Sequence, residues 1–415
     1  MEYSVTNMNE KNEVKVLFLV HQYDPNPKPC EVCVMRVQQS LLNLGINSDV
    51  LEYNGQEGLV KSTPCGDVYS IGAAKPKVDT TKKNILAEYS KKIPLLFRWP
   101  YVFNKSVRLK YKAKADELIQ KNHYKAIIGL TLPVDTAIVA SEYDNFIHYE
   151  LDAVANNPEY KRGIKKLYRG RLNRIERHLY EKAKLVIHVE FNRRYLEKYK
   201  DSQCYRKFTF SDIPNLVEPA RYPALESPND NLIHLAYFGA LVRDYRNPTY
   251  LIQILKKLNQ KVRIQCEFFT RGNCEDIVSD SAQESPDVFI QRGYVDQETV
   301  ARKQNSVDFL VSIGNKLSGT DYSLPSKTIE YIAMGKPIIH IAGGDNDSAI
   351  AYLEKYELAC ILYQNDDLNS NIDKLIRFVK ESKGKQVPFE VVKNEFYHNS
   401  PDYTAEIIKE FLGRG

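Results

Sequence analysis

The sequence predicts an α/β protein built from two doubly wound, Rossmann-like domains. Its 415 residues exceed one ordinary hydrophobic core and fit two domains of about 200 residues each. Short apolar, β-branched runs alternate with stretches of helical periodicity, which is typical of βαβ units around a parallel sheet. This alternation starts again after residues 217–228, so we expect the chain to divide near that point.

The first domain is expected over residues 1–217. A buried strand at 14–20 (VKVLFLV), a helix at 32–45 and a strand at 46–53 form its opening βαβ unit. The pattern continues with strands at 125–130, 145–151 and 185–190 and helices at 133–143, 159–184 and 192–200.

The second domain is expected over residues 218–395. Its first helix has Asn247 as a suitable N-cap and Pro248 at the first helical position. A last helix, within the segment 396–415, is expected to cross back to the first domain. The expected strands are 231–240, 262–270, 288–295, 307–314 and 337–343, and the expected helices are 247–260, 298–306, 325–334, 347–357, 368–383 and 402–412.

The composition is typical of a soluble globular protein, with 43% hydrophobic and 27% charged residues. Residues 1–13 are polar and no apolar run approaches the length of a membrane-spanning helix, so we expect a cytoplasmic protein. Seven cysteines, an odd number, suit reduced thiols. Cys30 and Cys33 form a C-x-x-C pair, but without a second pair nearby we expect two semi-buried thiols and no zinc site.

Residues 323–339, SLPSKTIEYIAMGKPII, suggest an anion site at a helix start. Pro325 suits the first helical turn, and Ser326 can cap the free amides there. Those amides attract phosphate, and Lys327 adds a cation for a diphosphate. Glu330 lies one turn further and suits a ribose diol, although a capped amphipathic helix with surface charges explains the same pattern.

Two other strand ends offer ligand contacts. In YFGALVRDYRNP (237–248), Gly239 permits close backbone approach, while Arg243 and Arg246 can clamp a diphosphate leaving group. In FIQRGYVD (289–296), the turn at Tyr294 offers a ring for a nucleotide base. The alternatives are a surface loop with two solvated arginines and a simple strand-end turn.

These three blocks, in this order and spacing, resemble the donor half of GT-B glycosyltransferases, and more narrowly the retaining family four. The resemblance covers roughly residues 230–345 well and the N-terminal half loosely. It implies two domains facing across a cleft, a nucleotide-diphosphate sugar donor, and no metal or other cofactor. It implies a hexosyltransferase-type reaction that retains the anomeric configuration, in cell-surface polysaccharide synthesis.

The resemblance also implies residue roles. Glu330 would hold the ribose, and Lys327 with Arg243 or Arg246 would hold the diphosphate, beside the amides near Ser326. Two features depart from the family pattern: Tyr322 stands where a sugar-contacting glutamate is common, and the first loop, HQYDPNPKPCEVC, has no glycine. These departures keep open two alternatives, which are a non-catalytic partner subunit and a nucleotide-sugar epimerase of the same fold.

The sequence indicates fewer candidate residues for the acceptor site than for the donor site. A departing phosphate oxygen can take the acceptor proton, so no strong base is required. Candidates at strand ends are His21, His148 and Asp152, with Asp152 the carboxylate we expect near a developing cation. Hydrogen-bonded structural histidines are the alternative.

Residues 161–184 carry ten Lys or Arg against Glu176 and Glu181 and show an apolar helical face. Residues 98–114 add Trp99 and other aromatic residues among cations. This combination suits an anionic membrane surface and a glycan or lipid-linked acceptor, although the apolar face would equally suit a core helix with solvated cations. One local patch without a binding motif does not indicate nucleic acid.

Overall fold

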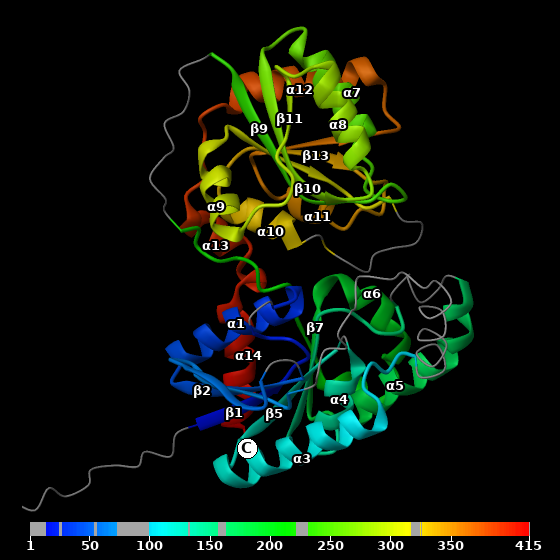
Figure 1. Ribbon diagram of the computed structural model, residues 1–415, viewed down its shortest axis with the longest axis vertical. Helices are drawn as coiled ribbons and strands as arrows, with labels where there is room; N and C mark the ends of the chain where they lie inside the picture. Colours follow the sequence, from blue (N-terminus) through cyan, green and yellow to red (C-terminus); the bar gives the residue numbers. More distant parts are fainter. Residues whose placement is uncertain are drawn as a thin grey trace, which may run out of the picture. The chain divides into compact units, whose positions relative to one another are not determined.

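The computed structural model describes residues 14–24, 27–53, 56–72, 99–131, 133–156, 163–220, 231–316, 324 and 326–414, and it confirms the α/β class (Figure 1). The chain divides into two compact units. The N-terminal unit comprises Met1–Pro214 and Pro401–Gly415, and the C-terminal unit comprises Asn215–Ser400. Within the described residues, none of the helices combines the length and apolar character that a membrane-spanning segment needs.

The described part of the N-terminal unit contains an eight-stranded sheet. Its neighbouring strands pair in parallel, apart from the antiparallel pair β3–β4. In spatial order the strands are β3 (Gly58–Thr63), β4 (Gly66–Ser70), β2 (Ile46–Glu52), β1 (Val14–Leu19), β5 (Ala126–Leu130), β6 (Phe146–Glu150), β7 (Leu185–Val189) and β8 (Phe208–Ser211).

Helices cover both faces of this sheet, which explains why its strands read as continuous apolar runs. Leu17 of β1 packs in the cluster that includes residues of α3 (Lys105–Asn122), α4 (Val134–Ala140) and α5 (Arg169–Lys182). Phe18 packs in the opposite cluster, with α1 (Pro29–Asn43) and α14 (Pro401–Gly413). The short helix α6 (Arg193–Leu196) follows β7.

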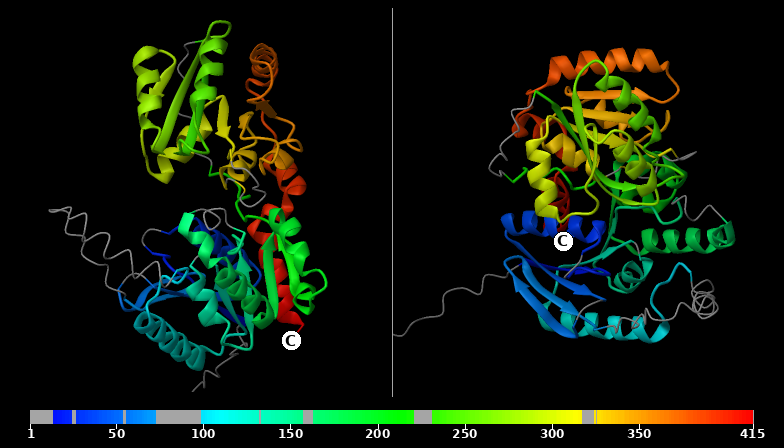
Figure 2. Two further views of the ribbon diagram at one scale, coloured as in Figure 1. Left: turned by 90° about the vertical axis from the view of Figure 1, so that its right-hand side faces the viewer. Right: turned by 45° about the horizontal axis from the view of Figure 1, so that its top comes forward.

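The C-terminal helix α14 packs beside α1 in the N-terminal unit (Figures 1 and 2). Ser40 of α1 donates a hydrogen bond to Asp402 at 2.7 Å, and the hydroxyls of Ser211 and Thr404 lie 2.7 Å apart. Polar contacts therefore link the C-terminal helix α14 to α1 and β8 of the N-terminal unit.

The described part of the C-terminal unit contains a six-stranded parallel sheet. Its strand order is that of the Rossmann fold, with a topological switch point between β9 and β12, where such sheets bind ligands beyond the carboxyl ends of the strands. In spatial order the strands are β11 (Phe289–Gln291), β10 (Ile264–Gly272), β9 (Ile233–Leu241), β12 (Phe309–Ile313), β13 (Ile338–Ala342) and β14 (Ala359–Tyr363).

Two groups of helices lie on opposite sides of this sheet (Figure 1). The main core joins the sheet to α7 (Thr249–Asn259), α8 (Glu275–Glu284) and α12 (Leu368–Ser382). The other side carries α9 (Gln297–Ser306), α10 (Ser326–Ala333), α11 (Ile350–Leu353) and α13 (Phe389–Glu395).

Glycine sets the turn between α10 and β13. Gly335 has φ 68°, and a Cβ added there would lie 2.1 Å from the carbonyl oxygen of Val387. The helix stop expected at Gly335 is therefore confirmed. The turn ends α10 and leads the chain into β13.

Candidate functional site

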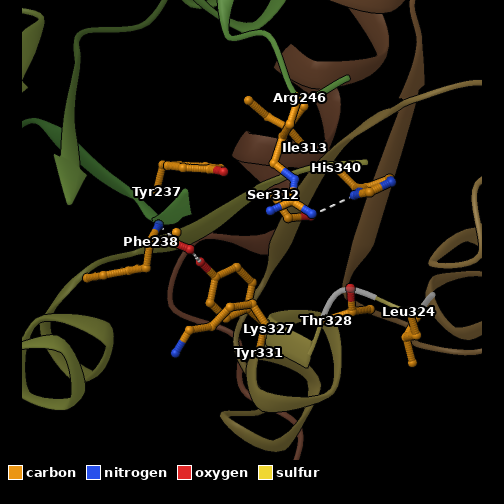
Figure 3. A pocket seen from close by; sticks show the side chains of 11 residues that line it. Tyr237, Phe238, Arg246, Ser312, Ile313, Leu324, Lys327, Thr328, Tyr331 and His340 are labelled. Carbon is orange, nitrogen blue, oxygen red and sulfur yellow. Dashed lines mark hydrogen bonds between the residues drawn. The ribbon is translucent and has the colours of Figure 1, made fainter. Parts of the chain in front are cut away.

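A cavity of about 230 Å³ opens at the switch point of the C-terminal unit (Figure 3). It lies where β9 and β12 end and where α10 begins, which is the position expected for a ligand site in this sheet topology. The lining residues are Tyr237, Phe238, Gly239, Arg246, Ser312, Ile313, Leu324, Lys327, Thr328, Tyr331 and His340.

Tyr331 of α10 holds the end of β9, and Tyr237 braces the strand end itself. The buried hydroxyl of Tyr331 donates to the carbonyl of Phe238 at 3.3 Å and accepts from the amide of Phe238 at 3.2 Å. Tyr237 donates to the carbonyl of Ala240 at 3.1 Å. The backbone around Gly239, which has φ 147°, is thereby fixed at the cavity wall.

Arg246 reaches the cavity because the loop after β9 folds back on itself. The amide of Arg246 donates to the carbonyl of Val242 at 2.7 Å, and the reverse bond is 3.2 Å. The Nε and Nη2 of its guanidinium donate to Oδ1 of Asn315 at 3.1 and 2.6 Å. This cation therefore bridges the loops after β9 and β12 beside the cavity.

Arg243, from the same loop, does not line the cavity. Its Nη2 pairs with Asp276 at 2.6 Å, its amide donates to Asn273, and its side chain is 47% exposed. Of the two arginines predicted for the diphosphate, the structure brings only Arg246 to the cavity.

The start of α10 presents Lys327 to the cavity. The ammonium of Lys327 lies 2.5 Å from Oε2 of the half-buried Glu330, which is not itself a lining residue. The side chain of Ser326, like the whole of Tyr322, lies outside the described residues.

Tyr294, the predicted base contact, is 74% exposed and is not part of the cavity wall. The guanidinium of Arg271 lies 5.3 Å from its ring centroid. The structure therefore places this ring outside the group formed by Gly239, Arg246 and Lys327.

Sequence reasoning missed a chain of three polar side chains at this site. Ser312 Oγ lies 2.6 Å from Nδ1 of His340, and Nε2 of His340 lies 3.0 Å from Oδ2 of Asp347 (Figure 3 draws the first contact). The available signals were a serine at a strand end and a histidine inside the expected strand 337–343. Neither stands out without the parallel register that pairs Ser312 with His340.

The predicted acceptor-side carboxylate, Asp152, belongs to the N-terminal unit and follows β6. Burial and the neighbouring Glu150 raise the pKa of Asp152 to about 6. A carboxyl with this pKa exchanges protons near neutral pH, as a general base must.

The two histidine candidates differ. His148 is fully buried, with Nε2 3.7 Å from Glu150 and 3.4 Å from the hydroxyl of Thr131, so it is a core residue. His21 stacks on Tyr53 with ring centroids 5.1 Å apart, and burial together with Lys28 lowers its pKa to about 4. His21 is therefore a neutral imidazole at ordinary pH.

The basic helix α5 packs its apolar face in the core and leaves its cations exposed, which is the second of the two expected arrangements. Its apolar residues Leu172, Ile175 and Leu179 are buried in the N-terminal core, so this face is not free to meet a membrane. Leu167, before the helix, is 80% exposed. The cations on α5 and in the segments next to it are exposed: Lys166, Arg169, Arg174, Arg177, Lys182 and Lys184.

The aromatic residues expected beside these cations are partly buried. Phe103 is buried, whereas Trp99 and Tyr101 are half-buried. Trp99 packs on Tyr168 with ring centroids 5.4 Å apart, and its carbonyl accepts a 2.7 Å hydrogen bond from Arg171.

Comparison with known proteins shows the fold. No family model matches the chain, and no curated protein matches it in sequence. Solved structures do match over nearly the whole chain. WaaG, a glycosyltransferase involved in lipopolysaccharide biosynthesis, is 12% identical with a TM-score of 0.54, over 95% of this chain and 99% of that chain.

WaaB, a lipopolysaccharide outer core galactosyltransferase, is 12% identical with a TM-score of 0.55, over 95% of this chain and 100% of that chain. The catalytic domain of starch synthase IV from Arabidopsis thaliana, bound to ADP and acarbose, is 11% identical with a TM-score of 0.56, over 97% of this chain and 99% of that chain. The chain therefore has the two-domain GT-B fold, which it shares with these three glycosyltransferases and also with a putative UDP-N-acetylglucosamine 2-epimerase from Listeria monocytogenes (10% identical, TM-score 0.54, over 95% of each chain).

Proposed function

We propose that this protein is a retaining, hexosyltransferase-type glycosyltransferase of family four that uses a nucleotide-diphosphate sugar. The observation that carries the proposal is the cavity at the switch point, where two cations, Arg246 and Lys327, meet the start of α10. Free amides at a helix start and flanking cations are the groups that bind a diphosphate.

The same groups suit the chemical step. The bond between the anomeric carbon and the diphosphate oxygen breaks, and a bond to the acceptor oxygen forms on the same face of the sugar. The acceptor proton passes to the departing phosphate oxygen. Arg246 and Lys327 stabilise the charge that develops on the diphosphate, so we propose transfer without a metal.

On the donor side, we propose that Glu330 holds the ribose and fixes Lys327, while Gly239 lets the donor approach the backbone. Ser326 contributes its amide, whereas Arg243, paired with Asp276, and the exposed Tyr294 make no direct contact with the diphosphate in this proposal. On the acceptor side, we propose Asp152 as the catalytic carboxylate of the N-terminal unit, whose charge stabilises the cation that develops at the anomeric carbon.

We propose a glycan or lipid-linked acceptor in polysaccharide synthesis, because the exposed cations of α5 suit an anionic membrane surface. The described residues contain no disulfide, which supports our proposal of a cytoplasmic location. Charge reversal at Arg174 and Arg177 should reduce sedimentation with anionic vesicles, whereas reversal at the exposed Lys355 and Lys380 should not. Equal sedimentation of both variants would reject this surface.

The proposal is tested by thermal shift with UDP, GDP, ADP, TDP and CMP and their common sugars, with a chelator present. A ligand of the native state raises the melting temperature by mass action. A shift with one nucleoside diphosphate and its sugar supports the donor site. No shift with any of them, from a folded protein, contradicts it and favours a non-catalytic partner subunit.

A nucleotide-sugar epimerase of the same fold would also bind such a ligand. With water in place of a glycan acceptor, it would release free sugar and nucleoside diphosphate, whereas a transferase requires the glycan or lipid-linked acceptor. Analysis of products from the shifted nucleotide sugar therefore separates these two functions.

A further inference from the structure

The chain from Ser312 to Asp347 is a built feature of the cavity. Ser312 and His340 line the cavity, and the side chains of His340 and Asp347 are each 1% exposed. Asp347 Oδ2 also accepts the amide of Gly343 at 2.9 Å, and Oδ1 accepts the amide of Ala349 at 3.0 Å. The carboxylate and the ring are therefore held in fixed positions.

A glycine makes room for this arrangement. A Cβ added at Gly314, just after β12, would lie 1.5 Å from Oδ2 of Asp347. Any side chain at this position would clash with the carboxylate. The glycine therefore lets Asp347 approach His340 at the end of β12.

Hydrogen-bond roles follow from the carboxylate. Burial raises the pKa of Asp347, but the hydrogen bonds from His340 and the backbone amides outweigh this and leave the pKa below its usual value. An ionised carboxylate only accepts, so Nε2 of His340 carries a proton. With a neutral ring, Nδ1 is then an acceptor and Ser312 must donate its hydroxyl proton to it.

This state does not suit an anionic ligand, because the Ser312 hydroxyl has its proton directed at His340 and not at the cavity. Protonation of Nδ1 reverses the roles. The imidazolium then donates to Asp347 and to Ser312, and the hydroxyl proton of Ser312 becomes free to point at an anion. The one bond formed is the N–H bond at Nδ1, and its proton comes from solvent.

The charged groups around His340 favour this reversal when a diphosphate binds. Arg246 and Lys327 line the same cavity and oppose a third positive charge while it is empty. Lys327 is paired with Glu330, and on the β14 side Lys374 donates to the carbonyl of Ile361, the register partner of His340. An entering diphosphate supplies the negative charge that compensates these cations.

We propose that Ser312 is a further donor-binding residue and that His340 and Asp347 are positioning residues that couple donor binding to uptake of one proton. This inference rests on the proposed function, since the ligand is the diphosphate of the sugar donor. It assigns no nucleophile. In serine hydrolases the ring nitrogen Nε2 faces the serine and Nδ1 faces the carboxylate, whereas here the two nitrogens are exchanged.

The test is a calorimetric titration of the full chain with the nucleotide sugar that gives the largest thermal shift. Its diphosphate has no ionisable proton near neutral pH, so proton uptake reports on the protein. Heats measured at pH 7.5 in two buffers of different ionisation enthalpy should reveal uptake of up to about one proton. Between pH 6 and 8.5, affinity should fall by at most about tenfold per pH unit.

His340→Asn should abolish both effects, whereas His234→Asn, at the opposite end of β9, should retain them. Ser312→Ala should weaken binding about tenfold at pH 6 and less at pH 8.5. Binding by wild type without proton uptake, or unchanged uptake in His340→Asn, overturns this inference and leaves the donor site intact. Absence of binding by every nucleotide sugar overturns the proposed function as well.

Discussion

Lys327 and Glu330, one turn apart on α10, form a direct ion pair with Nζ and Oε2 2.5 Å apart. The family resemblance assigns them to different parts of the donor, the diphosphate and the ribose. In the structure the carboxylate of Glu330 also orients the ammonium of Lys327. A substitution at either residue therefore removes the ion-pair partner of the other.

Glu330→Ala should weaken donor binding by about 1.5–3 kcal/mol, the range for a hydrogen bond to a charged group. Lys327→Met should cause a similar loss. Because the residues are in contact, the double variant should lose less than the sum, with a coupling of at least about 0.5 kcal/mol. Titration of the four proteins with the donor nucleotide measures this cycle.

The exposed pair Glu298 and Arg302 on α9 is the matched control, since it has the same kind of ion pair away from the cavity. Its variants should bind the donor as wild type does. Strictly additive losses at Lys327 and Glu330 would show that the ion pair has no part in the donor complex.

Gly239→Ala should destabilise the protein by about 1–3 kcal/mol. The reason is backbone strain, because φ is 147° and the nearest atom to an added Cβ, the hydroxyl of Tyr237, is 3.5 Å away and does not clash. Gly170→Ala in α5 is the control. Its added Cβ meets nothing within 4 Å, and it should stabilise by about 0.4–1 kcal/mol. Urea denaturation measures both, and a neutral Gly239→Ala would refute the strain.

His21 should contribute a pH-dependent loss of stability. Its pKa is about 4 in the folded protein and near 6.5 when unfolded, so between these values the unfolded chain binds more protons. Stability therefore falls as pH falls through this window. From pH 7 to 4.5, wild type should lose about 1–3 kcal/mol more than His21→Asn in urea denaturation. Parallel losses in the two proteins would contradict the buried, neutral histidine.

Much of the fold follows from local patterns. The runs at 14–20, 125–130 and 185–190 are strands because both sheet faces are covered, and Gly335 ends its helix through a positive φ. Sequence patterns missed several other elements, among them the buried strand β14. Half-exposed β3 and β4 have no continuous apolar run, and α3 has so many charges that its few buried residues give no clear periodicity.

Part of the donor site was predictable from the order of strands and helices along the chain. Gly239, Arg246 and Lys327 lie at strand ends or a helix start, so topology alone brings them together. The direction of a loop side chain is set by partners distant in sequence. Asp276 attracts Arg243 away, while Asn315 holds Arg246 at the cavity. The register between β12 and β13, which creates the Ser312–His340 contact, is likewise a tertiary property.

The two arginines of one loop provide the most direct test of the central claim, that the switch-point cavity binds the diphosphate of a sugar donor. Both are changed to glutamine, and each variant is titrated with the nucleoside diphosphate that shifts the wild-type melting temperature. Arg246→Gln should weaken binding by about 1.5–3 kcal/mol, whereas Arg243→Gln should change it by less than about 0.5 kcal/mol. Unchanged affinity in a folded Arg246→Gln, or a larger loss in Arg243→Gln, would place the diphosphate elsewhere and contradict the account.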